Sequence, residues 1–253
     1  MVFMLLNEIV DYLDEFLDIK NIQDSCKNGL EVEGKEEIKK IGFSVDACLE
    51  SFQKAVSVKC DLLIVHHGMF WGDIEYVTDI TYERVKHLIK NDIALYAAHL
   101  PLDIHPEVGN NVQLAKLLNL EIQNTFCKYR NIDVGIICKN DTDFNDLLKR
   151  IQKHFPVKYM KFNNVSKKVG IITGSGGLGI KEAVDKRCDT FITGEMRYID
   201  YHPIKEYEIN VIYGGHYATE IWGLKALMDH IQKKFDIDCE FLDLEEIQWK
   251  TEK

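Results

Sequence analysis

Two adjacent histidines follow an apolar run in the stretch Asp61–Gly68. Leu62–Val65 is short and apolar and carries β-branched residues, which is typical of a buried strand in a parallel sheet. Because ligands of open α/β sheets bind beyond the carboxyl ends of such strands, His66 and His67 lie where chemistry is expected. The alternative is a pair of turn histidines, one packed and one solvated.

Other predicted strand ends supply further imidazoles and carboxylates. The whole set is His66, His67, His99, Asp103, Glu195, His216 and Glu220. Such side chains suit zinc, iron, manganese or nickel, and the lack of a cysteine favours a site with open positions for water over a structural zinc site. Because the set is too large for one tetrahedral ion, two divalent metal ions per chain, bridged by a carboxylate, are predicted. Each histidine–carboxylate pair taken singly is also explained by a hydrogen bond or a salt bridge.

Strands that alternate with helices must position these side chains, and their pattern predicts an α/β fold. The expected strands include 41–45, 61–65, 93–98, 169–173, 190–193, 210–213 and 237–243. Helices are expected at 4–18, 47–58, 82–90, 110–118, 180–187, 196–207 and 219–234. The segment 121–165 is less regular, with strands expected near 132–138 and 157–162 and a helix near 143–154.

An internal repeat relates the two halves of the chain. The aligned pairs are Ile41–Val45 with Val169–Thr173, Asp61–Gly68 with Asp189–Met196 and, after about eleven residues of the loop 70–80 are deleted, Ala94–His99 with Val211–His216. The first two pairs share one shift without a gap, and in the third pair a carboxylate follows each histidine by four positions. The repeat predicts two related α/β lobes whose strand ends face one another. The lobes are expected to comprise residues 1–125 with 210–253, which carry most of the metal ligands, and residues 126–209.

The composition limits the classes of function. The chain has 253 residues, a net charge of −10 and a pI near 5.4, which argue against a broad nucleic-acid-binding face. The locally basic segment 149–168 leaves nucleic-acid binding open. Seven scattered cysteines without a CxxC pair fit a reducing compartment. The acidic residues within 4–18 favour an amphipathic helix over a signal peptide, and no run approaches a membrane span, so a soluble, cytoplasmic protein is expected.

A glycine-rich loop offers a second kind of ligand site. Gly174–Gly179 satisfies GxGxxG between a predicted strand and a predicted helix, which on its face is a dinucleotide fingerprint. The next strand ends in the metal-site region instead, so nicotinamide binding is not favoured. Backbone amides of Gly174, Ser175 and Gly176 at a helix N-terminus could hold a substrate phosphate near the metals. The alternative is tight packing of a strand–helix turn.

Four motifs together resemble one protein family. They are HHG-x-FW from His66, AAHLPLD from Ala97 with GNN from Gly109, the glycine-rich loop before TGE, and GGHYATE from Gly214. In this order the motifs resemble the Nif-three-like dinuclear-metal proteins, also called GTP cyclohydrolase I type 2 homologues, over essentially the whole chain. Many relatives have proline where this chain has Gly68, and Thr-Asn where it has Leu-Pro before Asp103, but neither difference removes a ligand.

The resemblance implies a fold, an assembly and a ligand set. The implied fold is two intertwined α/β domains related by internal duplication, with mixed, mostly parallel sheets flanked by helices. The implied assembly is a toroidal homohexamer. The metal ligands carried over by motif are His66, His67, Asp103, His216 and Glu220. Glu195 and His99 lie outside that set. We expect Glu195 to act as a general acid/base or to support a ligand, and His99 to orient Asp103 or Glu220, or each to form a salt bridge at a strand end.

The favoured function is a metal-dependent hydrolase. Two divalent ions would lower the pKa of a bridging water to about 7 and so supply hydroxide at neutral pH. The resemblance implies attack on the imidazole-ring carbon of GTP, and a phosphoester or other nucleotide could use the same residues. Aromatic residues near the site in sequence, which can stack a purine or form packing contacts, are Phe70, Trp71, Tyr76, Tyr198, Tyr201 and Tyr217. The alternative function is a ring-shaped, non-enzymatic metal-binding scaffold that binds nucleic acid or a protein partner.

Overall fold

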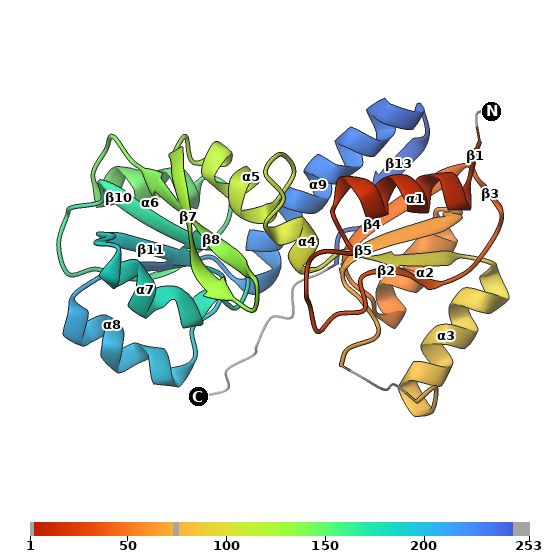
Figure 1. Cartoon of the computed structure of the whole chain (residues 1–253), viewed down its shortest axis with the longest axis horizontal. Coiled ribbons are helices and arrows are strands. Elements are labelled where there is room, and N and C mark those ends of the chain that lie inside the picture. The colour runs from red at the N-terminus through yellow and green to blue at the C-terminus, as the bar shows by residue number, and fades with distance from the viewer. Residues whose placement is uncertain (1–2, 73–75, 245–253) are drawn as a thin grey trace.

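The computed structural model describes residues 3–72 and 76–244, which form two lobes, each built on one sheet with helices against it (Figure 1). The α/β fold with helix-flanked sheets predicted from the sequence is confirmed. The helices are α1 (Leu6–Phe16), α2 (Leu49–Ser57), α3 (Asp79–Asn91), α4 (Leu100–Asp103), α5 (Asn110–Leu117), α6 (Phe144–Gln152), α7 (Ile180–Asp185), α8 (Tyr201–Tyr207) and α9 (His216–Phe235), with the 3₁₀ turns η1 (Gly176–Gly179) and η2 (Tyr198–Asp200).

The first lobe contains a five-stranded sheet in the order β13-β4-β5-β6-β2. Its strands are β2 (Gly29–Val32), β4 (Lys40–Asp46), β5 (Leu62–His67), β6 (Ala94–Ala97) and β13 (Asp238–Phe241). Only β2 is antiparallel to its neighbour. A small separate ladder pairs β1 (Met4–Leu5) with β3 (Glu37–Ile38).

The second lobe contains a six-stranded sheet in the order β7-β8-β10-β11-β12-β9. Its strands are β7 (Glu121–Tyr129), β8 (Ile132–Lys139), β9 (Lys158–Met160), β10 (Lys168–Ile172), β11 (Thr190–Thr193) and β12 (Asn210–Tyr213). The strands β10, β11 and β12 are parallel, and the remaining pairs are antiparallel.

The apolar run of β5 is continuous because both faces of this strand are covered. Leu62 and Ile64 pack into a core that includes α1 and α9, whereas Leu63 and Val65 pack into a core with α2 and α3. Because successive strand side chains point to opposite faces and helices cover both faces, every residue of the run is buried. The apolar run therefore carries the two histidines to the carboxyl edge of a rigid sheet.

The internal repeat is visible in the strand registers. Ile41 pairs with Leu62 and Val169 pairs with Thr190, which is the predicted shift without change. Asp61 accepts hydrogen bonds from the amides of residues 39 and 40, and Asp189 accepts them from those of residues 167 and 168. The repeat therefore extends to a side chain that ties the start of one strand to the next.

The third aligned pair needs a correction of one residue. Ala94 lies opposite Leu62, and the equivalent partner of Thr190 is Asn210 rather than the predicted Val211. Hydrogen-bond register sets this alignment, so His99 corresponds to Gly215 and not to His216. His99 therefore lies two residues beyond the end of β6, whereas His216 lies three residues beyond the end of β12.

Sheet membership also differs from the expected lobe boundaries. The predicted division places 121–125 and 210–213 with the first lobe, but β7 begins at Glu121 and β12 pairs with β9 and β11 in the second sheet. After β12 the chain returns through α9, between the lobes, to add β13 beside β4 (Figure 1). Residues 1–2, 73–75 and 245–253 of the predicted first lobe lie outside the described residues. Of the helices in the described ranges, none combines the length and the apolar character needed to cross a bilayer.

Candidate metal centre

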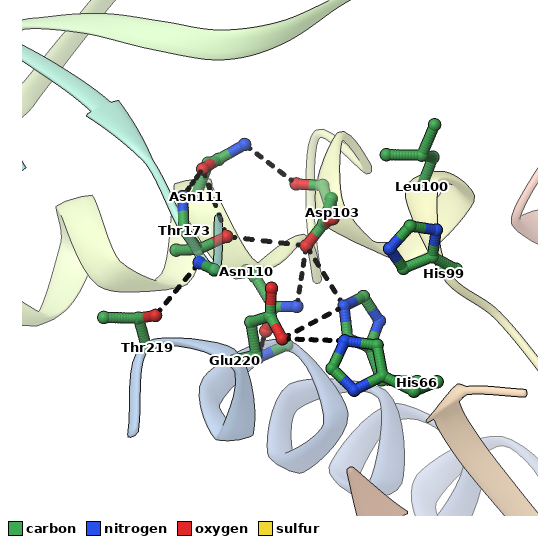
Figure 2. Close-up of polar contacts among 12 residues, drawn as sticks. His66, His99, Leu100, Asp103, Asn110, Asn111, Thr173, Thr219 and Glu220 are labelled. Atoms are coloured by element: carbon green, nitrogen blue, oxygen red, sulfur yellow. Dashed lines mark hydrogen bonds and ion pairs between the residues drawn. The ribbon is translucent and has the colours of Figure 1, made fainter. Parts of the chain in front are cut away.

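The carboxyl edges of both sheets meet at the junction of the lobes, where the strand-end side chains gather. His66 and His67 end β5, and Asp103 ends the short helix α4 after β6. His216 and Glu220 lie on the first turns of α9, after β12. Figure 2 shows His66, Asp103 and Glu220 pointing toward one another from these separate elements. The structure therefore brings together all five residues that the sequence predicts as ligands.

Glu220 lies at the centre of the cluster. Its Oε2 atom is 3.1 Å from Nε2 of His67, 3.1 Å from Nε2 of His216 and 3.5 Å from Nε2 of His66. Nε2 of His66 is also 3.5 Å from Oδ1 of Asp103. Three groups of described residues have ligand atoms within 4.8 Å of one another: His67 with His216 and Glu220, His66 with Asp103 and Glu220, and His66 with His67 and His99. A carboxylate shared by two such groups is suited to bridging two ions.

The imidazole rings are held so that Nε2 faces the cluster. Each Nδ1 lies beside an oxygen acceptor: the Ala98 carbonyl for His66 (2.9 Å), Asp46 for His67 (2.7 Å), Asp24 for His99 (2.9 Å) and Glu195 for His216 (3.2 Å). Because carbonyl and carboxylate oxygens only accept, Nδ1 must carry the proton. A neutral ring then directs its Nε2 lone pair inward, as in metal-binding histidines.

Two buried atoms at the centre fit a cation. His66 is fully buried and Glu220 is 2% exposed. Nε2 of His66 and Oε2 of Glu220 have no partner in hydrogen-bond geometry among the described residues. An unsatisfied buried polar atom costs about 1–3 kcal/mol, so two of them side by side call for a positive ion that both can bind.

The charges of the cluster favour protons or metal ions. Burial lowers the pKa of His67, but its contacts with Asp46 and Glu220 outweigh burial and raise that pKa to about 10. For His216, burial is outweighed chiefly by Glu220, and the pKa rises to about 9. Burial would raise the pKa of Glu220, yet the charge of His66 and the other imidazoles lower it well below its usual value. A metal ion entering the cluster would therefore displace protons from the imidazoles.

Asp103 is held by residues of the GNN motif and of the second lobe. Asn110 donates from Nδ2 to Oδ1 of Asp103 (2.9 Å), and the Thr173 hydroxyl lies 3.4 Å from the same oxygen. Asn111 donates to the Asp103 carbonyl (3.3 Å). Figure 2 shows how Asn110, Asn111 and Thr173 surround Asp103. The carboxylate is thus fixed from both lobes.

The glycine-rich loop packs against the cluster. Gly174 has φ +59°, and a Cβ there would lie 1.9 Å from Oε1 of Glu220. The amide of Gly174 donates to the Thr219 hydroxyl (3.1 Å) and that of Gly176 to the Thr193 hydroxyl (3.0 Å). Since both amides are already used within the protein, the contacts favour packing over the expected phosphate site. Ser175 lines the cavity beside the cluster.

His99 and Glu195, the two predicted site residues outside the ligand set, make different contacts. The expected role of His99 in orienting Asp103 or Glu220 does not match its contacts, because its Nδ1 pairs with Asp24. This contact, 2.9 Å from Nδ1 to Oδ2 of Asp24, fixes the orientation of the His99 ring. Glu195 contacts His216 and is half exposed, as expected for a residue that supports a ligand. Its role as a general acid/base stays a prediction.

Sequence reasoning missed Asp24 and Asp46. Asp46 is the last residue of β4, so the strand-end rule that found the histidines also points to it. Asp24 lies in the irregular segment between α1 and β2, where no periodic pattern gives a signal. Its carboxylate also accepts from the amides of Ser25 and Leu100, which holds the loop against the cluster.

Replacing Asp46 with alanine is expected to weaken metal binding by about 10- to 100-fold, because His67 loses the acceptor that fixes its ring. Asp46→Asn keeps an acceptor and should lose less. Affinity is measured by competition with a chelator. A second cavity, on the other side of His67, is lined by Asp46 and Glu50. The matched control is Glu50→Ala, because it removes a carboxylate from this second cavity that pairs with Lys54. Equal affinity of Asp46→Ala and Glu50→Ala would contradict the positioning role.

The chain is similar to known proteins over most of its length. The chain matches the family model described as Duf34/NIF3 (NGG1p interacting factor 3) over residues 4–248. A Pyrococcus abyssi protein described as a GTP cyclohydrolase 1 type 2 homolog is 43% identical over 242 residues, 93% of this chain and 96% of that protein. One from Pyrococcus horikoshii with the same description is 44% identical over 243 residues, 94% of this chain and 97% of that protein.

Solved structures share the fold. The structure described as protein ybgI, of unknown function, has a TM-score of 0.90 and 33% sequence identity to this chain. The match covers 96% of this chain and 99% of that one. The similarity therefore includes both lobes and the junction where the cluster lies.

Proposed function

Because the chain belongs to the Duf34/NIF3 family, as its motifs predict, we propose that the cluster is a dinuclear metal centre and the protein a metal-dependent hydrolase. The substrate would be a nucleotide or a related heterocycle, in line with the description of its relatives as GTP cyclohydrolase 1 type 2 homologs. The observation that carries the proposal is the pair of buried, unsatisfied atoms, Nε2 of His66 and Oε2 of Glu220, in the middle of the cluster.

The donor set divides between two ions. His67 and His216 would hold one ion and His66 and Asp103 the other, with Glu220 shared. Imidazole and carboxylate donors suit zinc, iron, manganese or nickel. Two such ions would lower the pKa of water to about 7 and so supply a nucleophile at neutral pH. The chain's own part is to hold the donors in place through the Nδ1 partners and to keep Glu195 within 3.2 Å of His216, where it can pass a proton to solvent.

Elemental analysis and a product assay test this proposal. The purified protein is expected to hold about two equivalents of a transition metal per chain, as its paired donor groups require. Incubation of the metal-replete protein with GTP should release formate. Little or no metal after reconstitution would contradict the metal centre. Full metal content without formate across several metals would reject the GTP reaction.

Replacing Glu195 with glutamine is expected to keep the metal content and to lower turnover by about 100-fold or more, as loss of a general acid/base does. The glutamine keeps the shape of the side chain but cannot carry the proton. Steady-state rates and metal content are measured on the same preparation. The control is Glu50→Gln, because Glu50 and Glu195 line the same cavity, on the other side of His67. Full activity of Glu195→Gln would remove Glu195 from the chemistry.

We also propose that the chain forms the homohexamer that its family resemblance implies. Exposed apolar side chains support it: Tyr76, Val77, Ile80 and Ile89 on and before α3, and Tyr198 and Ile199 in η2. Groups of this kind are common where protein surfaces meet. Sedimentation analysis tests the assembly, and a monomer at all concentrations would contradict it. Nucleic-acid binding by the segment 149–168 stays a prediction.

A further inference from the structure

The second cavity, on the other side of His67, has a volume of about 1330 Å³. His67 and His216 line both this cavity and a smaller one of about 450 Å³, whose wall includes Asp103 and Glu220. A molecule in the second cavity therefore reaches the same two imidazoles from another direction. Its volume exceeds the range of about 300–1,000 Å³ typical of small-molecule sites, so there is room for an extended group.

Two cationic side chains in the wall of the second cavity have no acidic partner among the described residues. They are Arg84, on α3 of the first lobe, and Lys158, at the start of β9 in the second lobe. Nε of Arg84 is buried and has no partner in hydrogen-bond geometry. The adjacent carboxylate, Glu83, pairs instead with Lys86 (3.2 Å). Because a buried donor without an acceptor is costly, the Arg84 guanidinium calls for an acceptor from outside the chain.

The acidic side chains that line the second cavity already have basic partners. The pairs are Asp46 with His67 (2.7 Å), Glu50 with Lys54 (3.0 Å) and Glu195 with His216 (3.2 Å). The unpaired charge of this wall is therefore positive and belongs to Arg84 and Lys158. The wall also includes Gly215–Ala218, the start of the long helix α9, where the helix dipole adds partial positive charge. Together these groups favour an anion in the second cavity.

We propose that the second cavity is an anion-binding subsite, in which the Arg84 guanidinium and the Lys158 ammonium receive phosphate. A guanidinium presents a planar fork of donors that matches phosphate oxygens, and an ammonium adds a compact charge on a flexible stem. The phosphate belongs either to a nucleotide that reaches the metal centre or to a free polyphosphate, since both present the same oxygens. The nucleotide source rests on the proposed function, whereas the subsite itself does not.

Removing the two charges tests the subsite without requiring turnover. Arg84→Gln and Lys158→Gln are titrated with GTP and with inorganic tripolyphosphate by calorimetry, on metal-replete protein. Bound metal ions also attract phosphate, but they are present in every variant, so the change on substitution reports on the side chain. We expect Arg84→Gln to weaken binding by about tenfold, and Lys158→Gln, at an exposed position, by less. The matched controls are Lys86→Gln on α3 and Lys153→Gln in the second lobe, both outside the lining.

The two ligands distinguish the sources of the phosphate. Weaker binding of GTP to Arg84→Gln would assign the phosphate chain of a nucleotide, and weaker binding of tripolyphosphate alone would assign a free polyphosphate. Wild-type affinity of Arg84→Gln for both ligands would overturn the inference, and so would an equal loss in the controls or no binding to the wild type. Metal content, measured after each titration, should stay at the wild-type level. If the protein held no metal, the proposed function would fail, while tripolyphosphate would still test the subsite.

Discussion

Replacement of Glu220 with alanine is expected to remove nearly all bound metal, with affinity reduced well beyond the roughly 10- to 100-fold loss typical of residues that only support a ligand. Two of the three possible donor groups include Glu220, so one substitution weakens both of the positions that it would bridge. It also takes away a buried negative charge, the one that raises the pKa of His67 and His216, and this charge would offset the positive charge of the bound ions. Metal content is measured after loading with zinc and dialysis.

Asp229→Ala is the matched control, because it removes an exposed carboxylate from the same helix, α9. It should keep the wild-type metal content. Glu220→Gln keeps the volume of the side chain and separates loss of charge from loss of packing, and it should also lose metal. If Glu220→Ala and Glu220→Gln both retained about two equivalents, the shared carboxylate would not be a ligand and the dinuclear assignment would fail.

The strand ends could be predicted from the sequence because their signals are local. An apolar run of strand length followed by polar side chains marks a carboxyl edge, and the repeat doubles that signal. The same two features predict His66, His67 and Glu220 as residues of the site. The repeat also explains why the lobes face each other, since each contributes its own carboxyl edge to the junction.

The partners of the histidines were harder to predict because they depend on the path of loops. Asp24 meets His99 across a long separation in sequence, through a segment that has no periodic pattern. The register of β12 depends on hydrogen bonds to β11, and a shift of one residue leaves the sequence pattern nearly unchanged. Composition and periodicity predict which residues lie at the edge of the sheet. The acceptor beside Nδ1 of each imidazole is set by tertiary contacts, which these patterns do not reveal.

Gly174 shows how a backbone position can control the site. Replacing it with alanine is expected to lower the free energy of unfolding by about 1–2 kcal/mol from the left-handed φ of +59° alone. The added Cβ would also lie 1.9 Å from Oε1 of Glu220 and 3.0 Å from Nε2 of His216. Because Glu220 is buried among three imidazoles, its carboxylate cannot move aside without leaving the cluster, so metal affinity should fall about tenfold or more.

Gly72→Ala separates the two effects. Gly72 also has a left-handed φ, +77°, but a Cβ there would meet nothing within 4 Å. Both variants should therefore melt at a lower temperature, by roughly 2–4 °C per kcal/mol for a chain of this size, while only Gly174→Ala loses metal. Thermal melting of the metal-free proteins and metal titration of each variant provide the two readouts. Equal metal affinity in the two variants would mean that Glu220 can yield to the methyl group and that its present position is not what binds the ions. A loss confined to Gly174→Ala would instead tie the glycine of the second lobe to the carboxylate at the centre of the site.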